Sequence, residues 1–122
     1  MTTTYEQLEV WQASYGLFLD VVRLTKTYPQ DERYVLAAQM RKAALSVPAN
    51  IVEGYGRSAA REKVRFYTIA KASAEELGFY LRASKDLGYA PDSRLQPLRA
   101  RGESVCRMLR RLIQRTAERI GP

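Results

Sequence analysis

The stretch VPANIVEGYGR, residues 47–57, decides how this chain folds, because it places one proline and two glycines inside an otherwise helical pattern. Pro48 lacks a backbone N–H and crowds the carbonyl of Ala44, so a helix that continues through it is expected to kink. Gly54 and Gly56 each lower helix propensity by about 1 kcal/mol. Gly54 falls on the apolar side of the helix, where the missing side chain lets another helix come close. We therefore expect a helix that is kinked near Pro48 and packed tightly against a neighbour.

Four segments of the chain have helical periodicity, and proline and glycine separate them. The hydroxyl of Thr4 is expected to cap the first helix, with Gln7 completing a capping box. Ser58 is the expected cap of the third helix, and Gly88 is expected to adopt a left-handed conformation at its end. The expected helices cover residues 5–28, 31–57, 59–87 and 93–120.

The composition is that of one compact domain, since 46% of the 122 residues are hydrophobic. Four helices joined by short turns predict an all-α fold, an antiparallel up-and-down four-helix bundle that spans residues 1–122. No apolar stretch approaches membrane-spanning length, and the first residues do not resemble a secretion signal. The single cysteine, Cys106, suits a reducing compartment. We therefore expect a cytoplasmic protein with no membrane partner.

Apolar residues on the first and third predicted helices exceed what one bundle neighbour requires. The first helix has two apolar seams, one at positions 8, 11, 15, 18, 22 and 25 and the other at positions 10, 17, 21, 24 and 28. The third has a broad apolar arc, with Tyr67, Leu77 and Leu81 on one side and Ile69 and Tyr80 on the other. This surplus favours self-association. A wide core in a monomer is the alternative.

A polar row borders the core face of the second helix, and it consists of Gln39, Ser46, Asn50, Glu53 and Arg57. In the structural interpretation, which we favour, Asn50 and Glu53 bond to backbone groups freed by Pro48, or to a neighbouring helix or subunit. In the functional interpretation, Glu53 joins Glu75 or Glu76 of the third helix in a carboxylate cluster that holds a metal.

The absence of histidine narrows the chemistry that the chain can perform. It excludes His-dependent triads, His-ligated zinc and the Glu-x-x-His pairs of di-iron bundles. We therefore predict no catalytic residue, no cofactor and no metal, and a protein that is not an enzyme.

The fourth predicted helix is strongly basic. Between residues 94 and 119 the sequence has eight arginines, no lysine and two acids, Glu103 and Glu118, so this segment contributes +6 of the net charge of +7. Like charges four residues apart repel each other by a few tenths of a kcal/mol, so stability does not explain this arrangement. Arginine binds phosphate and carboxylate groups bidentately. The predicted binding surface consists of Arg99, Arg107, Arg110, Arg111, Arg115 and Arg119.

The run QMRKAALSVPANIVEGYGRS, residues 39–58, with LEVWQ before it and FYTIAKASAEELGFYL after it, resembles the four-helix-bundle family called 23S rRNA intervening-sequence proteins. The positions that match the family's motif are Asn50, Ile51, Glu53 and Gly54, with Glu75, Glu76 and Leu77 in the third helix. The resemblance implies an antiparallel four-helix protomer that assembles into a homopentamer, and it brings no catalytic residue. It also implies a relation in architecture to the accessory proteins of diversity-generating retroelements, which bind a reverse transcriptase and nucleic acid through a basic surface.

These observations predict a non-enzymatic homo-oligomer that uses its arginine-rich fourth helix to bind nucleic acid, or an acidic or nucleoprotein partner. Sequence-specific binding is not expected, because we find no helix-turn-helix, zinc finger or aromatic RNA-binding motif. RNA and DNA are both open as ligands. The alternative is a structural protein-interaction scaffold that binds no nucleic acid and whose arginines neutralise its own acidic faces.

Overall fold

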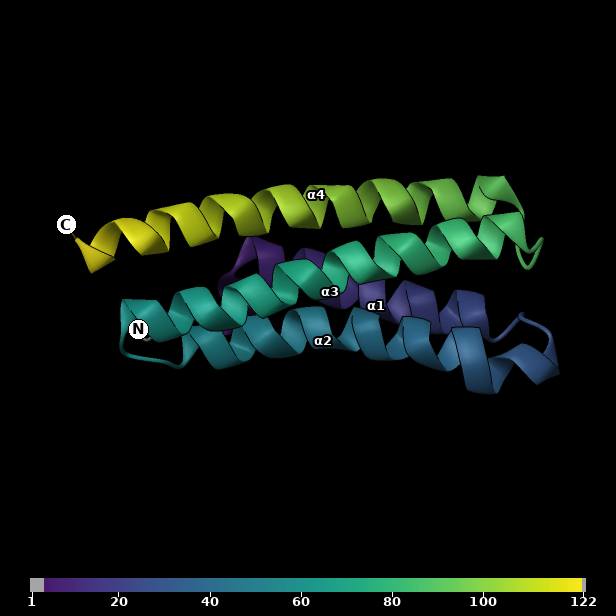
Figure 1. Ribbon diagram of the computed structural model, residues 1–122, viewed down its shortest axis with the longest axis horizontal. Coiled ribbons are helices and arrows are strands. Elements are labelled where there is room, and N and C mark those ends of the chain that lie inside the picture. Colours follow the sequence, from purple (N-terminus) through teal and green to yellow (C-terminus); the bar gives the residue numbers. More distant parts are fainter. Residues whose placement is uncertain (1–3, 122) are drawn as a thin grey trace.

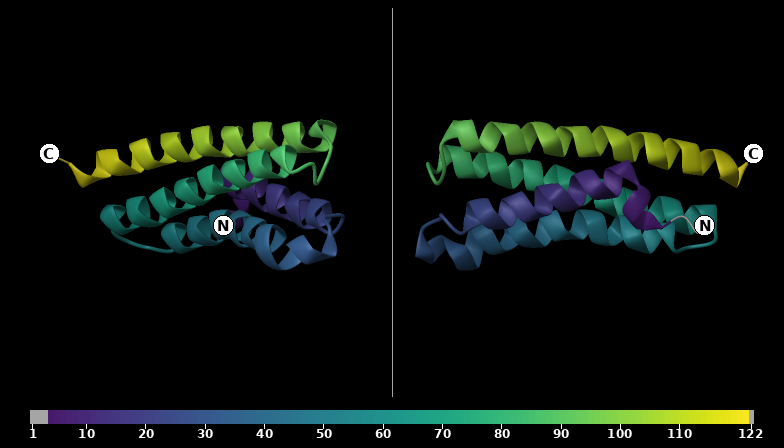
Figure 2. Two further views of the ribbon diagram at one scale, coloured as in Figure 1. Left: turned by 45° about the vertical axis from the view of Figure 1, so that its right-hand side comes forward. Right: turned by 180° about the vertical axis from the view of Figure 1, so that it is seen from behind.

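The computed structural model describes residues 4–121, and within this range the chain forms four long helices and no strand. The helices are α1 (Glu9–Thr25), α2 (Ala38–Tyr55), α3 (Ala60–Asp86) and α4 (Asp92–Ala117). Figure 1 shows that consecutive helices run in opposite directions, and the rear view in Figure 2 shows α1 between α2 and α4. The prediction of an all-α chain built from four helices is confirmed for the described residues.

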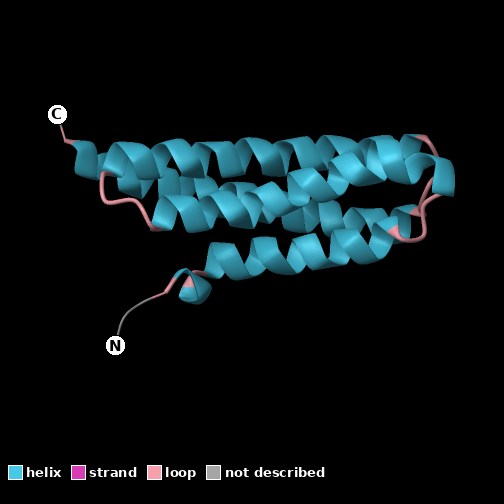
Figure 3. Cartoon of the chain, turned by 90° about the horizontal axis from the view of Figure 1, so that it is seen from below, coloured by secondary structure: helices cyan, strands magenta, loops and turns pink. Residues whose placement is uncertain are grey.

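Short helical turns and loops lie at the two ends of the bundle, as Figure 3 shows. A 3-10 turn, Tyr5–Gln7, precedes α1, and another, Glu118–Ile120, follows α4. Between α1 and α2 the chain forms a 3-10 turn, Gln30–Glu32, and then one π-helical turn, Arg33–Ala37. The expected helix over residues 31–57 is therefore regular only from Ala38 onward and ends at Tyr55.

The core is a continuous cluster of apolar side chains from all four helices. On α1 it uses the seam of Val10, Leu17, Val21 and Leu24, each at most 7% exposed. The other predicted seam of α1 lies at the edge of the core. There Trp11 and Phe18 are half-buried, and Tyr15 is exposed.

Gly54 is the point at which α2 and α3 approach most tightly in the predicted motif. A Cβ atom added to Gly54 would lie 2.6 Å from Cε1 of the Tyr67 ring on α3. Tyr67 is itself only 3% exposed, so the ring cannot move aside into solvent. The expectation that a neighbouring helix comes close at Gly54 is confirmed.

The start of the first helix was wrongly predicted. Thr4 makes no side-chain capping bond, and the capping box with Gln7 does not form. Leu8 adopts an extended conformation that separates the first turn from α1, which begins at Glu9. The turn brings the ring of Tyr5 to 5.1 Å from that of Trp11, edge to face. Packing between these rings, rather than a polar cap, shapes the N-terminal end.

The helix junctions agree with the predictions in one case and differ in another. Gly88 has the expected left-handed conformation, with φ of 73°. The amide of Tyr89, next in the chain, donates to the carbonyl of Ser84 and closes the end of α3. The cap of α3 is Ala59 rather than Ser58, and no side chain bonds to the free amides there.

Pro48 lies inside α2, and its ring is buried in the bundle. The helix continues through it, and the kink expected there stays a prediction. α4 has 26 residues and α1 has 17, so the last turns of α4 extend past the start of α1, as Figures 1 and 2 show.

Candidate nucleic-acid interface

α4 presents an apolar face to the bundle and arginines to solvent. Its buried positions include Leu95, Leu98, Val105 and Leu109, which recur at spacings of three, four and seven residues. The arginines fall between them because the helical period leaves the other positions outward. We call the predicted set of Arg99, Arg107, Arg110, Arg111, Arg115 and Arg119 the arginine surface.

No member of the arginine surface forms an ion pair with a residue whose side chain the structure describes. Arg99 is half-exposed, and the other five are exposed. The acidic faces of the other helices therefore do not neutralise these arginines within one protomer.

Arg101 is the exception on α4. Its guanidinium Nη1 lies 2.6 Å from Oδ2 of Asp20 on α1, and Asp20 also binds Arg23 at 2.6 Å. The hydrogen bond from Arg101 is the main reason that the pKa of Asp20 lies below its usual range, with Arg23 adding to it. Arg101 was left out of the predicted binding surface, and the structure assigns it to joining α1 and α4.

The arginine surface divides into two sides. Arg99, Arg107 and Arg110 line a groove of about 530 Å³ between α3 and α4. Arg111 and Arg115 instead line a smaller cleft, of about 180 Å³, beside the N-terminal end of α1. The sequence predicted a single binding surface, and five of its six arginines lie along two flanks of α4.

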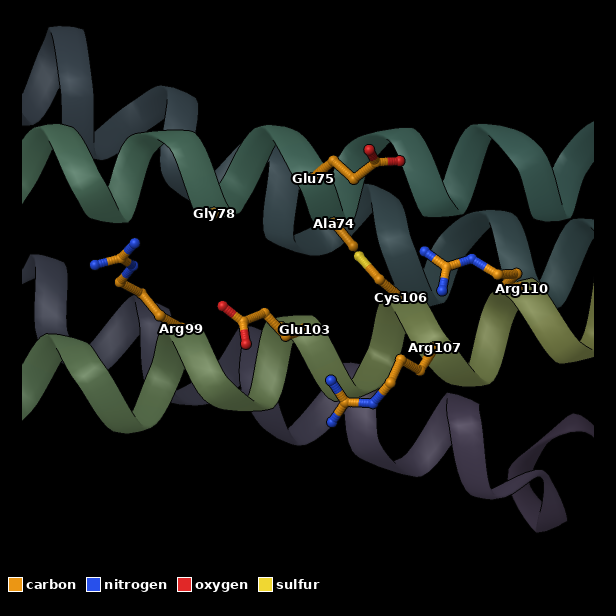
Figure 4. A pocket seen from close by; sticks show the side chains of 9 residues that line it. Ala74, Glu75, Gly78, Arg99, Glu103, Cys106, Arg107 and Arg110 are labelled. Atoms are coloured by element: carbon orange, nitrogen blue, oxygen red, sulfur yellow. The ribbon is translucent and has the colours of Figure 1, made fainter.

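The groove between α3 and α4, which we call the α3/α4 groove, has charged walls and a floor of small residues. The floor consists of Ala74, Gly78, Gly102 and Cys106. Figure 4 shows Arg99 and Arg110 toward its two ends and Glu103 on the α4 wall beside Arg99. Burial raises the pKa of the Cys106 thiol, and the nearby Glu75 raises it further, so the sulfur is a neutral thiol at pH 7. Sequence reasoning missed this groove, because its residues come from two helices and the pattern of each helix alone does not show how they pack.

Arg119 lies in the 3-10 turn after α4, which contacts α3. Lys63 of α3 donates from Nζ to the carbonyls of Gly54 and Tyr55, at 3.2 and 2.8 Å, and so caps the end of α2. Burial lowers the pKa of Lys63, and the positive charge of Arg119 lowers it further. The charge of Arg119 therefore acts on Lys63 at this end of the bundle, and like charges repel.

The three glutamates of the predicted carboxylate cluster do not come together. Glu53 pairs with Arg57 at 3.1 Å, Glu75 pairs with Lys71 at 2.9 Å, and Glu76 accepts a hydrogen bond from the Tyr80 hydroxyl at 2.5 Å. Within residues 4–121, no three acidic or cysteine side chains are grouped as metal ligands would be. Each of the three glutamates instead has a partner four residues away in the chain.

Asn50 has a structural role between α2 and α3. Its Nδ2 donates to the carbonyl and to the hydroxyl of Ser46, at 2.8 and 3.0 Å. The Ser46 hydroxyl lies 2.8 Å from that of Ser73 on α3. Asn50 thus bonds within α2, to Ser46 rather than to the Ala44 carbonyl that Pro48 leaves without its amide partner. The contact with α3 is made by Ser46, so a bond from Asn50 to a neighbouring helix or subunit stays a prediction.

No helix among the described residues is long and apolar enough to cross a membrane.

Comparisons with known proteins agree with this architecture. Over residues 6–111 the chain matches the model of a family described as 23S rRNA-intervening sequence protein. A crystal structure of a protein of unknown function from the S23 ribosomal protein family of Bacteroides thetaiotaomicron is similar, with a TM-score of 0.80 and 19% identity. The similarity covers 85% of this chain and 97% of that protein, and at this identity it shows the fold alone. No curated protein matches the chain.

Proposed function

The chain belongs to the family of 23S rRNA-intervening sequence proteins, and we propose that it is a non-enzymatic, homo-oligomeric bundle protein that binds nucleic acid through the arginine surface of α4. The observation that carries this proposal is that all six arginines lack an ion-pair partner among the described side chains. A polyanion would supply the negative charges that the described side chains of the protomer do not offer to these arginines. Because the same charges lie on both flanks of α4, a nucleic-acid backbone is a better match than a small acidic ligand.

Self-association is the second part of the proposal. Six large apolar side chains are exposed on the described surface, and none of them lies on α4: Tyr15, Val35, Leu45, Ile69, Phe79 and Leu87. Phe79 is 66% exposed and Leu87 is 57% exposed, which is costly for a monomer in water. Burying these residues between copies leaves α4 free and repeats its charge around the assembly. The pentamer that the family resemblance implies is one such arrangement, in which each protomer is an antiparallel four-helix bundle.

Binding without sequence specificity follows from the type of contact. The arginine surface offers charge and bidentate donors to phosphates, and phosphate contacts carry no sequence information. A nucleoprotein complex, such as the reverse transcriptase partner that the resemblance implies, would meet the same surface through its nucleic acid.

Light scattering during size-exclusion chromatography tests both parts of the proposal. The protein is run alone and with a mixed-sequence RNA or DNA duplex at low and at high salt. We expect an oligomer that shifts with nucleic acid at low salt only. If four phosphates are neutralised, raising salt from 50 to 200 mM lowers the affinity roughly 100-fold.

The other outcomes select the alternative or reject the proposal. An oligomer that binds no nucleic acid at any salt concentration would identify a protein-interaction scaffold. The exposed apolar residues on α1, α2 and α3 are also consistent with such a scaffold. A monomer would reject self-association.

A further inference from the structure

The α3/α4 groove contains a carboxylate that forms no ion pair or hydrogen bond with any described side chain. Glu75 on the α3 wall is paired with Lys71 at 2.9 Å. Glu103 on the α4 wall has no ion pair or hydrogen bond with any described side chain, although Arg99 and Arg107 lie four residues to either side. Pairs at this spacing are within reach of each other on a helix. The groove therefore presents three free guanidinium groups and one free acceptor.

This combination does not suit a ligand that carries only phosphates. The guanidinium groups attract phosphate, whereas the exposed carboxylate of Glu103 repels it and accepts from a hydrogen-bond donor instead. The phosphates of a nucleic-acid strand only accept hydrogen bonds, and its donors are the N–H groups of the bases and, in RNA, the 2′-hydroxyl. Base amines depend on sequence, but the 2′-hydroxyl occurs on every ribose and is absent from DNA.

We propose that the α3/α4 groove seats a short stretch of single-stranded RNA in preference to DNA, with Arg99, Arg107 and Arg110 on phosphates and Glu103 accepting from a 2′-hydroxyl. The proposal rests on the nucleic-acid binding proposed above and names the strand and the sugar that this surface takes. It requires no base-specific contact. An acceptor for the 2′-hydroxyl therefore distinguishes RNA from DNA without recognising the base sequence.

The dimensions of the groove support a single strand. Its volume of about 530 Å³ is in the range of pockets that enclose a small ligand. A duplex is too wide to enter a space between two packed helices, whose axes lie about 8–10 Å apart. The groove is open because its floor has small side chains. A Cβ atom at Gly78 would meet nothing within 4 Å, so a larger side chain fits there and fills the space.

The first test compares two probes that differ only in the 2′-hydroxyl, oligouridylate and oligodeoxyuridylate of equal length, by fluorescence anisotropy. A hydrogen bond to a charged acceptor predicts about a tenfold preference for the ribose strand in the wild-type protein. Glu103→Ala removes both the acceptor and the repulsion of phosphate. The preference should fall to near one, while oligodeoxyuridylate binds at least as tightly as before.

Glu118→Ala is the matched control. Glu118 is an exposed acid in the turn after α4, outside the groove, and its replacement changes the net charge by the same amount. It should raise affinity for both probes equally and leave their ratio unchanged. A ratio that falls equally in both variants would show a general charge effect and overturn the assignment of Glu103.

Gly78→Leu tests the groove without changing any charge. It should weaken oligouridylate binding about tenfold and bring the two probes to similar affinities, with circular dichroism unchanged. Unchanged binding would place the strand elsewhere on α4 and overturn the proposal.

The results separate this inference from the proposed function. If both probes bind with a steep salt dependence but equal affinity, nucleic-acid binding stands and the RNA preference is wrong. If neither probe nor a duplex binds at low salt, both proposals fall.

Discussion

The exposed apolar residues and the arginine surface occupy separate parts of this molecule, and they differ in the neighbours that their side chains have. The apolar residues lie between positions 15 and 87, and the arginines between 99 and 119. The rings along α1 contact one another: the centroids of Trp11 and Tyr15 are 5.0 Å apart in a stacked pair, and those of Tyr15 and Phe18 are 6.3 Å apart. The six arginines of the arginine surface, by contrast, form no ion pair with a described side chain.

This difference in neighbours indicates what kind of partner each region would bind. Part of the excess apolar area on α1 is already removed from water by its own neighbours, so a second copy adds to an existing cluster. The charge on α4 is uncompensated, and repulsion within it grows in any assembly that brings copies together. The two regions therefore need different partners, and variants in one should leave the other's property intact.

The largest expected effect comes from reversing charge on α4. Replacing Arg107, Arg111 and Arg115 with glutamate should lower nucleic-acid affinity at least 100-fold, because each reversal turns a phosphate contact into a repulsion. The fold and the oligomer should remain, since these side chains are exposed and unpaired. Anisotropy with a mixed-sequence duplex measures the loss, and light scattering monitors the assembly. Unchanged affinity would refute the arginine surface as the binding site.

A smaller effect is expected from placing a charge on the aromatic side of α1. Tyr15 is 39% exposed, and Tyr15→Lys should weaken self-association about tenfold or more, as loss of an aromatic contact does at interfaces. Sedimentation equilibrium gives the association constant, and Tyr15→Phe serves as the control that keeps the ring. Binding of nucleic acid per protomer should not decrease. An oligomer as stable as the wild type would exclude this side of α1 as the contact.

Asn50→Ala probes a position outside both regions. The substitution removes the bonds from Asn50 to Ser46 and should lower the free energy of unfolding by about 1 kcal/mol. Urea denaturation measures this change. Affinity for nucleic acid should remain at the wild-type value in the folded protein. Loss of binding by a well-folded oligomer would mean that the Asn50 row belongs to a ligand site.

The smallest effect concerns the one paired arginine of the comparison, Arg101. The pKa of Asp20 is lowered in the folded state, so its ion pair stabilises the protein above the unfolded pKa of about 3.9 and this contribution is lost as pH falls through the folded value. Both side chains are more than a third exposed, so Asp20→Asn should cost less than about 1 kcal/mol at pH 7. Urea titrations at pH 7 and below pH 3 should show the wild type and the variant converging in acid. A difference that persists in acid would contradict this origin.

The sequence was a good guide to features set by local pattern. The left-handed Gly88 and the close contact at Gly54 each depend on spacing or on one residue's conformational freedom, and the structure agrees with them. The start of α1 was missed because the Thr4 cap competes with packing of the Tyr5 ring, which depends on Trp11, six residues along the chain.

Features that depend on two helices were not predictable in the same way. The α3/α4 groove needs Gly78 of α3 and Gly102 of α4 to face each other, and the Asp20–Arg101 pair joins residues 81 positions apart. A helical pattern shows which side of each helix is apolar, but it does not show which neighbouring helix that side packs against. The same holds for the carboxylates, since Glu53 and Glu75 each pair with a basic residue four positions away in the chain, Arg57 and Lys71.

The unequal lengths of α1 and α4 have a consequence for local unfolding. Because the last turns of α4 extend past the start of α1, they have fewer helices beside them than the middle of α4 does. Amide hydrogen exchange should therefore be slow around Leu109 and become progressively faster toward Ile120. Arg115 and Arg119 sit on this weakly protected end. Slower exchange there upon addition of nucleic acid would show that the ligand tightens the part of the helix that the fold leaves least constrained.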